Sequence, residues 1–590
     1  MRLLWAVATF AAVARCEEIQ HMDVQALVQW GIAKLGEKGQ MAQGFDALER
    51  AFHEDARPAP VTARSPYGQW LATMIGRWHV ERVAYDRALH WYGRAMAEGP
   101  PQQNDCLSMQ MATLVNPYPR NVDDAAAVVA AYFRRMSALV EKPGGLSVAG
   151  VQDSDPYTYC MSTAFYLEAY LDADLREAAR LHALVALRAF PDLAYVAPLS
   201  CRSRAKPRLG VASASFGPSS VTADFGETFS RLDRELFEEI IFVDVKERAA
   251  PSPYLRDRAA AGDRVVVVDV HSAGWLARAR QTIAALDLDV LLYWDLTMST
   301  KIQRLGMARL ARVQANTHGH PVTSGIDGSV MDAYVSWGAA EIDDAQNHYT
   351  ETLVRLPTLH QYYARRVGPD GRSSQDGQHF KHLRRSDFPV PAGHWYACMQ
   401  KPFKLHPAFD AMLAAIQRAD PEARLVLHDL DQADARAARR ARLEAAGLDL
   451  GRVHFLAALP HHRLLALYDL ADVVLDSYLA GGCTTTREAL ELGAVVVTLP
   501  AAYLGGRWSY AYLKHIGVED TIASSAADYV RLAVRFATDA DARRDLRRRV
   551  RENVVRLFEQ EAAVRSWERA LLDLAPTADA ATCSGARAEL

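Results

Sequence analysis

The sequence has few cysteines, no excess of either charge and no long hydrophobic run, and each absence excludes a class of protein. Seven cysteines in 590 residues are too few for a disulfide scaffold, and no Cys-x-x-Cys pair indicates a structural zinc site. Lys and Arg number 67 against 71 Asp and Glu, a net charge of -4, so no basic excess indicates nucleic-acid binding. A content of 50% hydrophobic and 23% charged residues is that of a globular protein.

The first 16 residues have the pattern of a secretory signal peptide. Arg2 gives a positive start, and Leu3 to Ala14 is an uncharged stretch shorter than the about 20 apolar residues that span a bilayer. Small residues at Ala14 and Cys16 suit signal peptidase. We therefore predict a signal peptide over 1–16, a lumenal or secreted protein and no membrane span; the alternative is a cytoplasmic protein with an apolar first helix.

Residues 20–200 are rich in alanine and have helical periodicity, with few strand signals. One stretch has the spacing of small and aromatic residues that is typical of a helix-turn-helix repeat: Trp70, Leu71, Trp78, Tyr85, Ala88, Tyr92 and Ala95, followed by Pro100. Further amphipathic helices are expected over 122–139, 159–171 and 175–190. The region is either tetratricopeptide-like or a generic helical domain.

From residue 206 the pattern changes to short apolar runs that alternate with helices, which predicts parallel α/β sheets. The first series of strands is expected at 209–214, 239–244, 264–269, 289–294 and 312–316, and the second at 395–399, 424–428, 452–456, 471–476 and 494–498. Between them, residues 364–394 are rich in Arg, Gly and Pro, and are interpreted as a solvated linker or insertion. Long charged helices over 526–574 precede a flexible tail, 576–590. Two doubly wound domains, 206–363 and 395–575, would face a cleft where ligands bind.

The strongest local signal for an anion site follows the expected strand at 471–476. Gly481 and Gly482 allow close backbone approach, and Cys483, Thr484 and Thr485 then open a helix. Free N–H groups and hydroxyls at a helix N-terminus suit a diphosphate. Glu488 stands one turn further on, where its carboxylate would accept hydrogen bonds from a ribose. The alternative is a capped helix with a tight entry turn.

Two further signals belong to the same domain. Gln400 and Lys404 follow its first strand, so the positive charge of Lys404 would neutralise a diphosphate leaving group; a surface lysine is the alternative. His461 and His462 follow another strand and would stack on or hydrogen-bond a base, or simply form a polar loop. Their spacing is not that of a metal site.

These motifs, in this order, resemble the catalytic region of the protein O-linked N-acetylglucosamine transferase family, which includes the SPINDLY-like proteins. The resemblance rests on Gln400 to Pro407, Leu475 to Glu488 and Val497 to Arg507, together with the opening loop Arg208 to Gly217 and the segment Thr317 to Gly325. It covers about residues 206 to 575. The family also carries a tetratricopeptide region before its catalytic part.

The resemblance implies an α/β protein of GT-B type, with two Rossmann-like doubly wound domains facing a cleft behind a helical, tetratricopeptide-like region. UDP-N-acetylglucosamine would bind as the donor substrate, mainly to the second lobe, and no cofactor is implied. Carried over by position, the donor site comprises Gln400, Lys404, His461, His462, Cys483, Thr484, Thr485 and Glu488.

The general base is less evident, because Ser219 occupies the approximate position of a His that the family has after Phe-Gly. His320 is our substitute, with an ordinary pKa that would suit a base, and His318 is the competitor. Gly319, Pro321 and Thr323 complete this predicted cleft segment. Transition-state charge would be stabilised by Lys404 and the helix N-terminus, so no metal is expected.

The predicted function is an inverting, metal-independent transferase that moves N-acetylglucosamine onto Ser/Thr of protein acceptors, with the helical region as a possible acceptor-binding part. Three alternatives stay open: GDP-fucose as the donor, Asn as the acceptor, or a helical-repeat binding protein with a catalytically weakened transferase. No nucleic acid is expected as a partner.

Overall fold

The computed structural model describes residues 24–35, 41–55, 68–82, 84–98, 104–148, 155–163, 171–199, 204–246, 251–272, 274–368 and 370–576. The predicted signal peptide and almost all of the predicted tail lie outside the described residues. The chain divides into two compact units: the first is Met1–Tyr118, Arg134–Ser162 and Leu430–Ala441, and the second is Pro119–Phe133, Thr163–Asp429 and Arg442–Leu590. No helix among the described residues is both long and apolar enough to cross a membrane.

The first unit is built mainly from helix pairs, α1 with α2 and α3 with α4. Four residues of the predicted helix-turn-helix pattern, Leu71, Ala88, Tyr92 and Ala95, are buried in its core, whereas Trp70 is 41% exposed. The predicted helical character is confirmed; assignment to the tetratricopeptide class stays a prediction. The helices are α1 (Val24–Leu35), α2 (Met41–Asp55), α3 (Gly68–Glu81), α4 (Tyr85–Glu98), α5 (Asn104–Thr113), the second part of α6 (Val122–Glu141), α7 (Pro156–Cys160) and the first part of α15 (Ala433–Ala445).

A disulfide between Cys106 in α5 and Cys160 at the end of α7 closes a long loop of this unit. Both cysteines are almost completely buried. Next to Cys106, Asp105 forms an ion pair with Lys142 and accepts a hydrogen bond from the backbone N–H of Ser147 at 2.9 Å. The cross-link and this carboxylate therefore join α5 to segments more than 30 residues further along the chain.

Replacing Cys106 and Cys160 together by Ser is expected to destabilise this unit by about 2–4 kcal/mol, because the unfolded chain regains loop entropy. Hydrogen exchange would report this as a 30- to 1,000-fold faster exchange of the most protected amides of α5 and α7. Dithiothreitol should have the same effect on the wild type and none on the double variant. Unchanged exchange in the double variant would contradict a stabilising disulfide.

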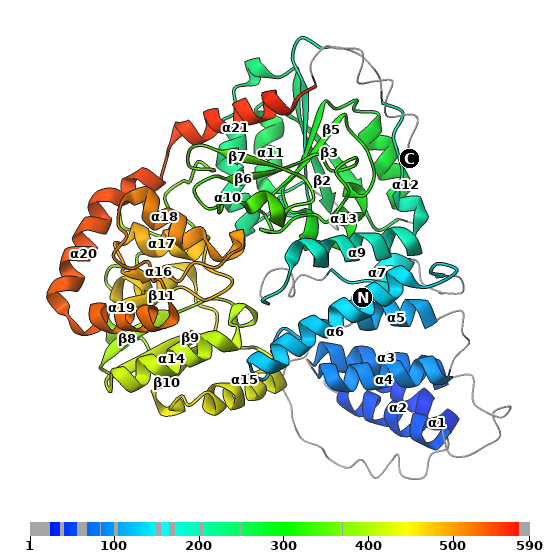
Figure 1. The fold of residues 1–590 in the computed structure, drawn as a ribbon, viewed down its shortest axis with the longest axis horizontal. Coiled ribbons are helices and arrows are strands. Elements are labelled where there is room, and N and C mark those ends of the chain that lie inside the picture. Colours follow the sequence, from blue (N-terminus) through cyan, green and yellow to red (C-terminus); the bar gives the residue numbers. More distant parts are fainter. Residues whose placement is uncertain are drawn as a thin grey trace. The chain divides into compact units, whose positions relative to one another are not determined.

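The second unit contains two parallel sheets (Figure 1). The first has the order β3-β2-β1-β4-β5-β6-β7, and the second β10-β9-β8-β11-β12. The strands of the first are β1 (Arg208–Ser213), β2 (Glu239–Lys246), β3 (Arg264–Asp269), β4 (Val290–Tyr293), β5 (Val313–Thr317), β6 (Ala333–Trp337) and β7 (Thr352–Leu356). Those of the second are β8 (His394–Cys398), β9 (Ala423–His428), β10 (Val453–Leu456), β11 (Val473–Leu475) and β12 (Val496–Val497). We call the parts built on these sheets the first and second lobes.

Helices connect the strands of both lobes. In or next to the first lobe they are α9 (Leu175–Ala189), α10 (Ser220–Ser230), α11 (Pro253–Ala260), α12 (Trp275–Ala284) and α13 (Thr300–Gly306). The later helices are α14 (Pro407–Ala419), α15 (Ala433–Ala445), α16 (His461–Leu470), α17 (Thr484–Glu491), α18 (Trp508–Ile516), α19 (Ala526–Thr538), α20 (Ala540–Asn553) and α21 (Glu561–Leu574). Together with the sheets they form the GT-B architecture implied by the resemblance.

All ten predicted strands are present, each within two residues of its expected bounds. Their apolar runs are continuous because both faces of a parallel sheet are covered by helices. The sequence analysis missed β6 and β7, which extend the first sheet. In β6 every residue is buried, including the polar Ser336, so its sequence Ala-Tyr-Val-Ser-Trp does not form a plain apolar run.

The order of strands reverses between β1 and β4 in the first sheet and between β8 and β11 in the second. Ligands of open α/β sheets bind beyond the carboxyl ends of the strands at such a reversal. In the second lobe, Gln400 follows β8 and Asp476 follows β11, so both lie at this place. The topology thus positions the predicted donor residues where a ligand crevice is expected.

Two segments differ from their predicted assignment. Residues 364–394 do not form a solvated linker alone, because Phe380, Phe388 and Val390 are buried in the core of the second lobe. The last helix, α21, was expected within the second lobe. Its residues Val564 and Trp567 instead belong to the hydrophobic core of the first lobe.

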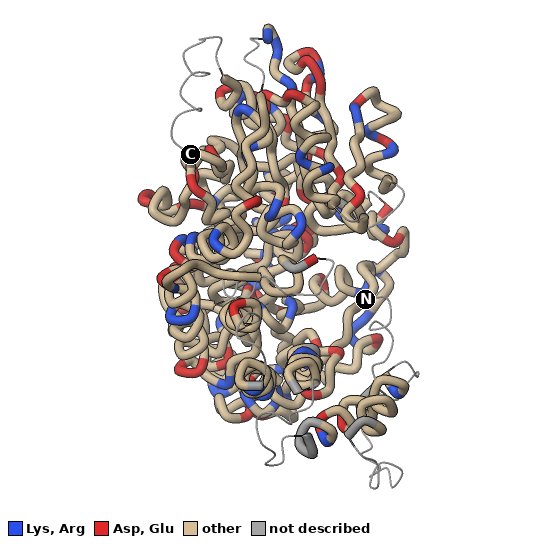
Figure 2. The backbone as a smooth tube through the Cα atoms, turned by 90° about the vertical axis from the view of Figure 1, so that its right-hand side faces the viewer, with Lys and Arg blue, Asp and Glu red and all other residues tan. Residues whose placement is uncertain are grey.

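Charged residues of both signs are interspersed along the described chain, and Figure 2 shows no large region of a single sign in its coloured part. This distribution agrees with the nearly neutral composition. Positive charge at a site must therefore come from individually placed residues.

Candidate active site

The loop between β11 and α17 is held in shape by the buried carboxylate of Asp476. This carboxylate accepts hydrogen bonds from the backbone N–H of Gly482 and the hydroxyl of Thr498, both at 2.7 Å. A Cβ atom at Gly482 would lie 2.6 Å from the amide nitrogen of Gln400, so a larger residue would displace this side chain from its present contact. Burial raises the pKa of Asp476, and the nearby charge of Lys404 opposes this rise.

Lys404, Gln400 and Thr485 meet next to this loop, as the sequence predicts. The Gln400 amide donates to the Thr485 hydroxyl at 2.6 Å, and Lys404 Nζ lies 3.4 Å from Gln400 Oε1 and 3.3 Å from the carbonyl oxygen of Gly481. Burial lowers the pKa of Lys404. The ammonium group is thus positioned at the N-terminal end of α17, where its charge and the helix dipole act on the same space.

On another side of the same helix end, Thr484 and Cys483 face the first lobe. Asp224 of α10 accepts a hydrogen bond from Thr484 at 3.3 Å and forms a buried ion pair with Arg487. Cys483 Sγ lies 3.1 Å from the hydroxyl of Tyr512, and burial raises the pKa of Cys483 to about 12. The thiol is therefore protonated at neutral pH, and the N-terminus of α17 is tied to α10.

The Arg487 guanidinium is enclosed as well as paired. Its centre lies 3.4 Å from the ring centroid of Tyr363, a stacked cation–π arrangement. Tyr363 also shares a hydrogen bond with Tyr512, with 3.1 Å between the two hydroxyl oxygens. Asp224, Arg487 and the two tyrosines thus form a buried polar junction between the lobes.

The two histidines predicted to contact the nucleotide base have different surroundings. His461 is buried and bridges two groups: its Nδ1 lies 2.7 Å from Ser373 Oγ and its Nε2 3.0 Å from Glu488 Oε1. His462 is more accessible and pairs with Asp376 at 2.8 Å. The structure therefore brings His461 together with Glu488 on α17, and both histidines contact the 364–394 segment, His461 through Ser373 and His462 through Asp376.

His320 lies beyond the end of β5, and its Nδ1 lies 2.6 Å from Thr297 Oγ1. Burial, with a contribution from the charge of Lys404, lowers the pKa of His320 to about 3. The expectation of an ordinary pKa is therefore wrong, because an enclosed imidazole loses the hydration that stabilises its charged form. Because the charge of Lys404 contributes to the lowered pKa of His320, these two side chains lie near each other.

His318, the competing base, is surrounded by aromatic side chains. Its Nε2 lies 2.7 Å from Nε2 of His360, and its ring packs against Phe225 at 4.5 Å and Trp508 at 5.0 Å between centroids. Burial and the charge of Arg487 lower the pKa of His318 well below its usual value. The surroundings of His318 are thus those of a packed residue of the interlobe core.

The other predicted cleft residues have structural partners. Gly319 has no room for a side chain, since a Cβ atom would lie 2.0 Å from the carbonyl oxygen of Trp294. Thr323 is buried and donates to Glu351 at 2.5 Å. Ser219 is the N-cap of α10 and accepts from the backbone N–H of Thr222 at 3.2 Å. Pro321 lines a pocket that we describe below.

Four residues that hold the site together by hydrogen bonds or ion pairs were not predicted from the sequence: Asp224, Arg487, Asp476 and Ser373. Arg487 could have been found, because it lies three residues after Thr484 and so on the same face of the helix. Asp224 and Ser373 come from distant segments, and no local pattern marks them. Among the described residues, no group of three or more His, Cys, Asp and Glu is arranged to hold a metal ion.

Comparisons with known proteins find similar sequences and a similar fold. Residues 381–565 match the model of Glycosyl transferase family 41. The "Probable UDP-N-acetylglucosamine--peptide N-acetylglucosaminyltransferase SPINDLY" of Solanum lycopersicum is 28% identical over 263 residues, which cover 44% of this chain and 27% of that protein. The UDP-N-acetylglucosamine--peptide N-acetylglucosaminyltransferase of Caenorhabditis elegans is 36% identical over 104 residues, or 18% of this chain and 9% of its own. The matched part is therefore a minor fraction of these relatives.

Among solved structures, an O-GlcNAc transferase mutant from Thermobaculum terrenum is similar over 95% of this chain and 98% of its own, with a TM-score of 0.62 and 21% identity. A likeness at this identity concerns the fold. These findings confirm the resemblance expected from the sequence: residues 381–565 match the model of glycosyl transferase family 41, and the chain is similar to SPINDLY proteins in sequence and to an O-GlcNAc transferase in fold.

Proposed function

We propose that the protein is an inverting glycosyltransferase that moves N-acetylglucosamine from UDP-N-acetylglucosamine onto Ser or Thr hydroxyls of proteins. The observation that carries this proposal is the convergence of Lys404, Gln400 and Thr485 on the N-terminus of α17. A departing nucleoside diphosphate gains negative charge in the transition state. Fixed positive groups that meet this charge lower the barrier.

In this proposal each donor-site residue has a task. Lys404 and the first N–H groups of α17 neutralise the diphosphate, and the Thr484 and Thr485 hydroxyls donate hydrogen bonds to it. The Glu488 carboxylate, held by His461, accepts hydrogen bonds from the ribose hydroxyls. Because Lys404 and the helix end supply the positive charge, the reaction needs no metal ion.

We propose that His320 acts on the acceptor side of the same centre. With a pKa of about 3 its imidazole is neutral at pH 7. It is therefore suited to orient an acceptor hydroxyl by a hydrogen bond, rather than to hold the proton of that hydroxyl. The hydroxyl proton would then be released to solvent late, when the new bond to the sugar has already made that oxygen acidic.

The test is the release of UDP from UDP-N-acetylglucosamine in the presence of a mixture of Ser- and Thr-containing peptides. We expect turnover that excess EDTA does not reduce, and a mass increase of one N-acetylhexosamine on the peptides. GDP-fucose and peptides with Asn as the only acceptor serve as the comparison donor and acceptor. No turnover of any nucleotide sugar by the folded protein would contradict the enzyme, and loss of turnover in EDTA that Mn²⁺ restores would contradict the metal-independent mechanism.

We also propose that the protein works in the secretory pathway. The signal pattern of residues 1–16 and the buried Cys106–Cys160 disulfide support this, since stable disulfides form in oxidising compartments. A fusion of residues 1–16 to a reporter tests it, and a reporter that stays in the cytosol would contradict it.

A further inference from the structure

A small pocket lies beside the proposed reaction centre and is not used by the donor. It has a volume of about 120 Å³. This is more than the about 10–15 Å³ that one water needs on the same measure and less than the about 300–1,000 Å³ of pockets for drug-sized ligands, so the pocket suits one side chain rather than a nucleotide sugar. It is lined by Leu171, Asp172, Leu175, Pro321, Val322, Tyr478, Leu479, Ala501, Ala502, Tyr503 and Gly505.

Chain contacts place this pocket next to the acceptor side of the centre. Pro321 directly follows His320, and a Cβ atom on Gly505 would lie 3.3 Å from the Pro321 ring. The carbonyl of Gly505 accepts from the N–H of Gly481 at 2.9 Å, and the carbonyl of Gly481 lies 3.3 Å from Lys404 Nζ. A continuous set of contacts thus connects the pocket wall to both His320 and Lys404.

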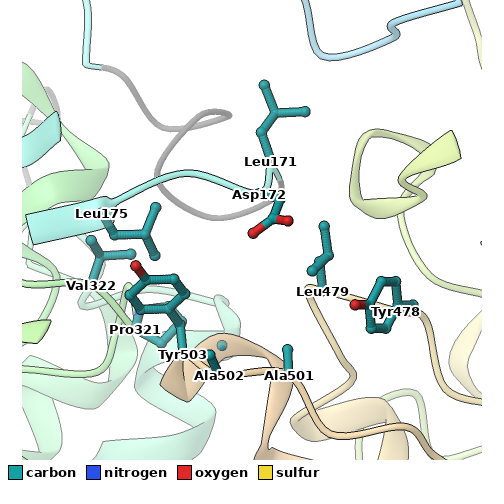
Figure 3. Close-up of a pocket in the computed structure, with 11 residues that line it drawn as sticks. Leu171, Asp172, Leu175, Pro321, Val322, Tyr478, Leu479, Ala501, Ala502 and Tyr503 are labelled. Carbon is teal, nitrogen blue, oxygen red and sulfur yellow. The ribbon is translucent and has the colours of Figure 1, made fainter. Parts of the chain in front are cut away.

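The walls of the pocket are mostly apolar, and among its described lining residues Asp172 is the only charged one. Figure 3 shows the Asp172 carboxylate directed into the space between Tyr503 and Leu479. The pKa of Tyr503 is raised by its burial and, in part, by the negative charges of Asp174 and Asp172. No Lys or Arg of the described ranges forms an ion pair with Asp172 within 4 Å.

The basic groups near the pocket are neutral or engaged elsewhere. His406 interacts electrostatically with Asp172, but burial lowers the pKa of His406 to about 4, so it is neutral at pH 7. The Arg507 guanidinium donates to the carbonyls of Ala340 at 2.6 Å and of Ala501 at 3.0 Å, and it is not part of the lining. His348 packs against Tyr503, with 4.4 Å between centroids, and burial lowers its pKa, which makes it neutral at pH 7. The pocket therefore presents net negative charge to a ligand.

Building on the proposed function, we infer that this pocket is an acceptor subsite for a basic side chain, Lys or Arg, close in sequence to the glycosylated hydroxyl. Such a side chain has an apolar stem and a charged end, which match the apolar walls and the Asp172 carboxylate. The rings of Tyr478 and Tyr503 offer additional cation–π contact. The subsite would select among Ser and Thr residues by their basic neighbours.

Peptide binding tests the inference without relying on turnover. Fluorescent alanine-rich peptides with one Thr, and with Lys, norleucine or Glu scanned through the four positions on either side, are titrated onto UDP-saturated full-length protein. At the best position we expect Lys to bind about five- to tenfold more tightly than norleucine, with Glu weakest. The Lys preference should shrink at high salt, because the pair is partly exposed.

Two variants make the assignment specific. In Asp172→Asn the Lys and norleucine peptides should bind equally, and in Asp172→Lys the Glu peptide should bind best. Asp343→Asn, an exposed carboxylate outside the pocket, should keep the wild-type order. Equal binding of Lys and norleucine peptides by the wild type, or a Lys preference that survives in Asp172→Asn, would overturn the subsite. Absence of sugar transfer to peptides that do bind in this order would instead contradict the proposed function.

Discussion

Replacing Lys404 by Met is expected to lower kcat for sugar transfer by about 10²–10³-fold, the effect of removing one group that stabilises developing charge in an active site. Met has a similar length and an apolar stem, so the space near Gln400 and Gly481 stays filled while the charge is lost. Because the charge on the diphosphate grows in the transition state, kcat should fall more than the affinity for UDP. Initial rates at saturating donor and acceptor, with calorimetric titration of UDP, measure the two effects.

Lys401→Met is the matched control. Lys401 lies three residues earlier in the same connection after β8, but its side chain is exposed. It should retain wild-type kcat, because an exposed charge near a site is screened by water and salt. Full activity of Lys404→Met would remove the diphosphate role that we assign to Lys404, whatever the behaviour of the control.

Replacing Arg487 by Met is expected to destabilise the second unit by about 3–5 kcal/mol. The substitution leaves the Asp224 carboxylate buried without its ion-pair partner, which is more costly than the pair is stabilising. The loss of the stacked contact with Tyr363 adds to this effect. Urea unfolding followed by tryptophan fluorescence measures the change, with hydrogen exchange of α10 and α17 to locate it.

A double variant distinguishes an uncompensated charge from a simple loss of packing. Asp224→Leu combined with Arg487→Met removes both charges and should recover most of the stability that either single variant loses. Arg487→Lys should be intermediate, because a lysine keeps the charge but lacks the planar fork and the stacking surface. A double variant that is as unstable as the sum of the single variants would contradict the role of the ion pair.

The sequence predicted the ten regular strands and the proximity of Gln400, Lys404 and Thr485 because these depend on local patterns. Apolar runs of strand length mark buried parallel strands, and the order Gly482, Cys483, Thr484, Thr485 marks a helix that begins directly after a tight turn. These features are encoded within a few neighbouring residues. The structure places Gln400, Lys404 and Thr485 in one contact cluster, as the motifs predict.

What the sequence could not predict depends on contacts between distant segments. Asp224 and Arg487 are an ordinary Asp and an ordinary Arg in their own helices, and only the packing of α10 against α17 makes them a buried pair. Ser373 contacts His461 because the 364–394 segment folds onto the second lobe. The pKa of His320 likewise follows from its enclosure, which the residue type and its neighbours in sequence do not encode.

The packing of α21 in the first lobe has a consequence for how the chain folds during its synthesis. The core of the first lobe contains Val564 and Trp567, and the indole N–H of Trp567 donates to the carbonyl of His360 at 2.5 Å. A ribosome releases the chain from its N-terminus, so the whole second lobe emerges after β7 and before the residues that complete the first core. Until then Phe229, which packs against both Trp294 and Trp567, lacks its contact with Trp567. The two lobes are consequently joined in folding, and the first lobe reaches its native core only after the whole second lobe has been synthesised.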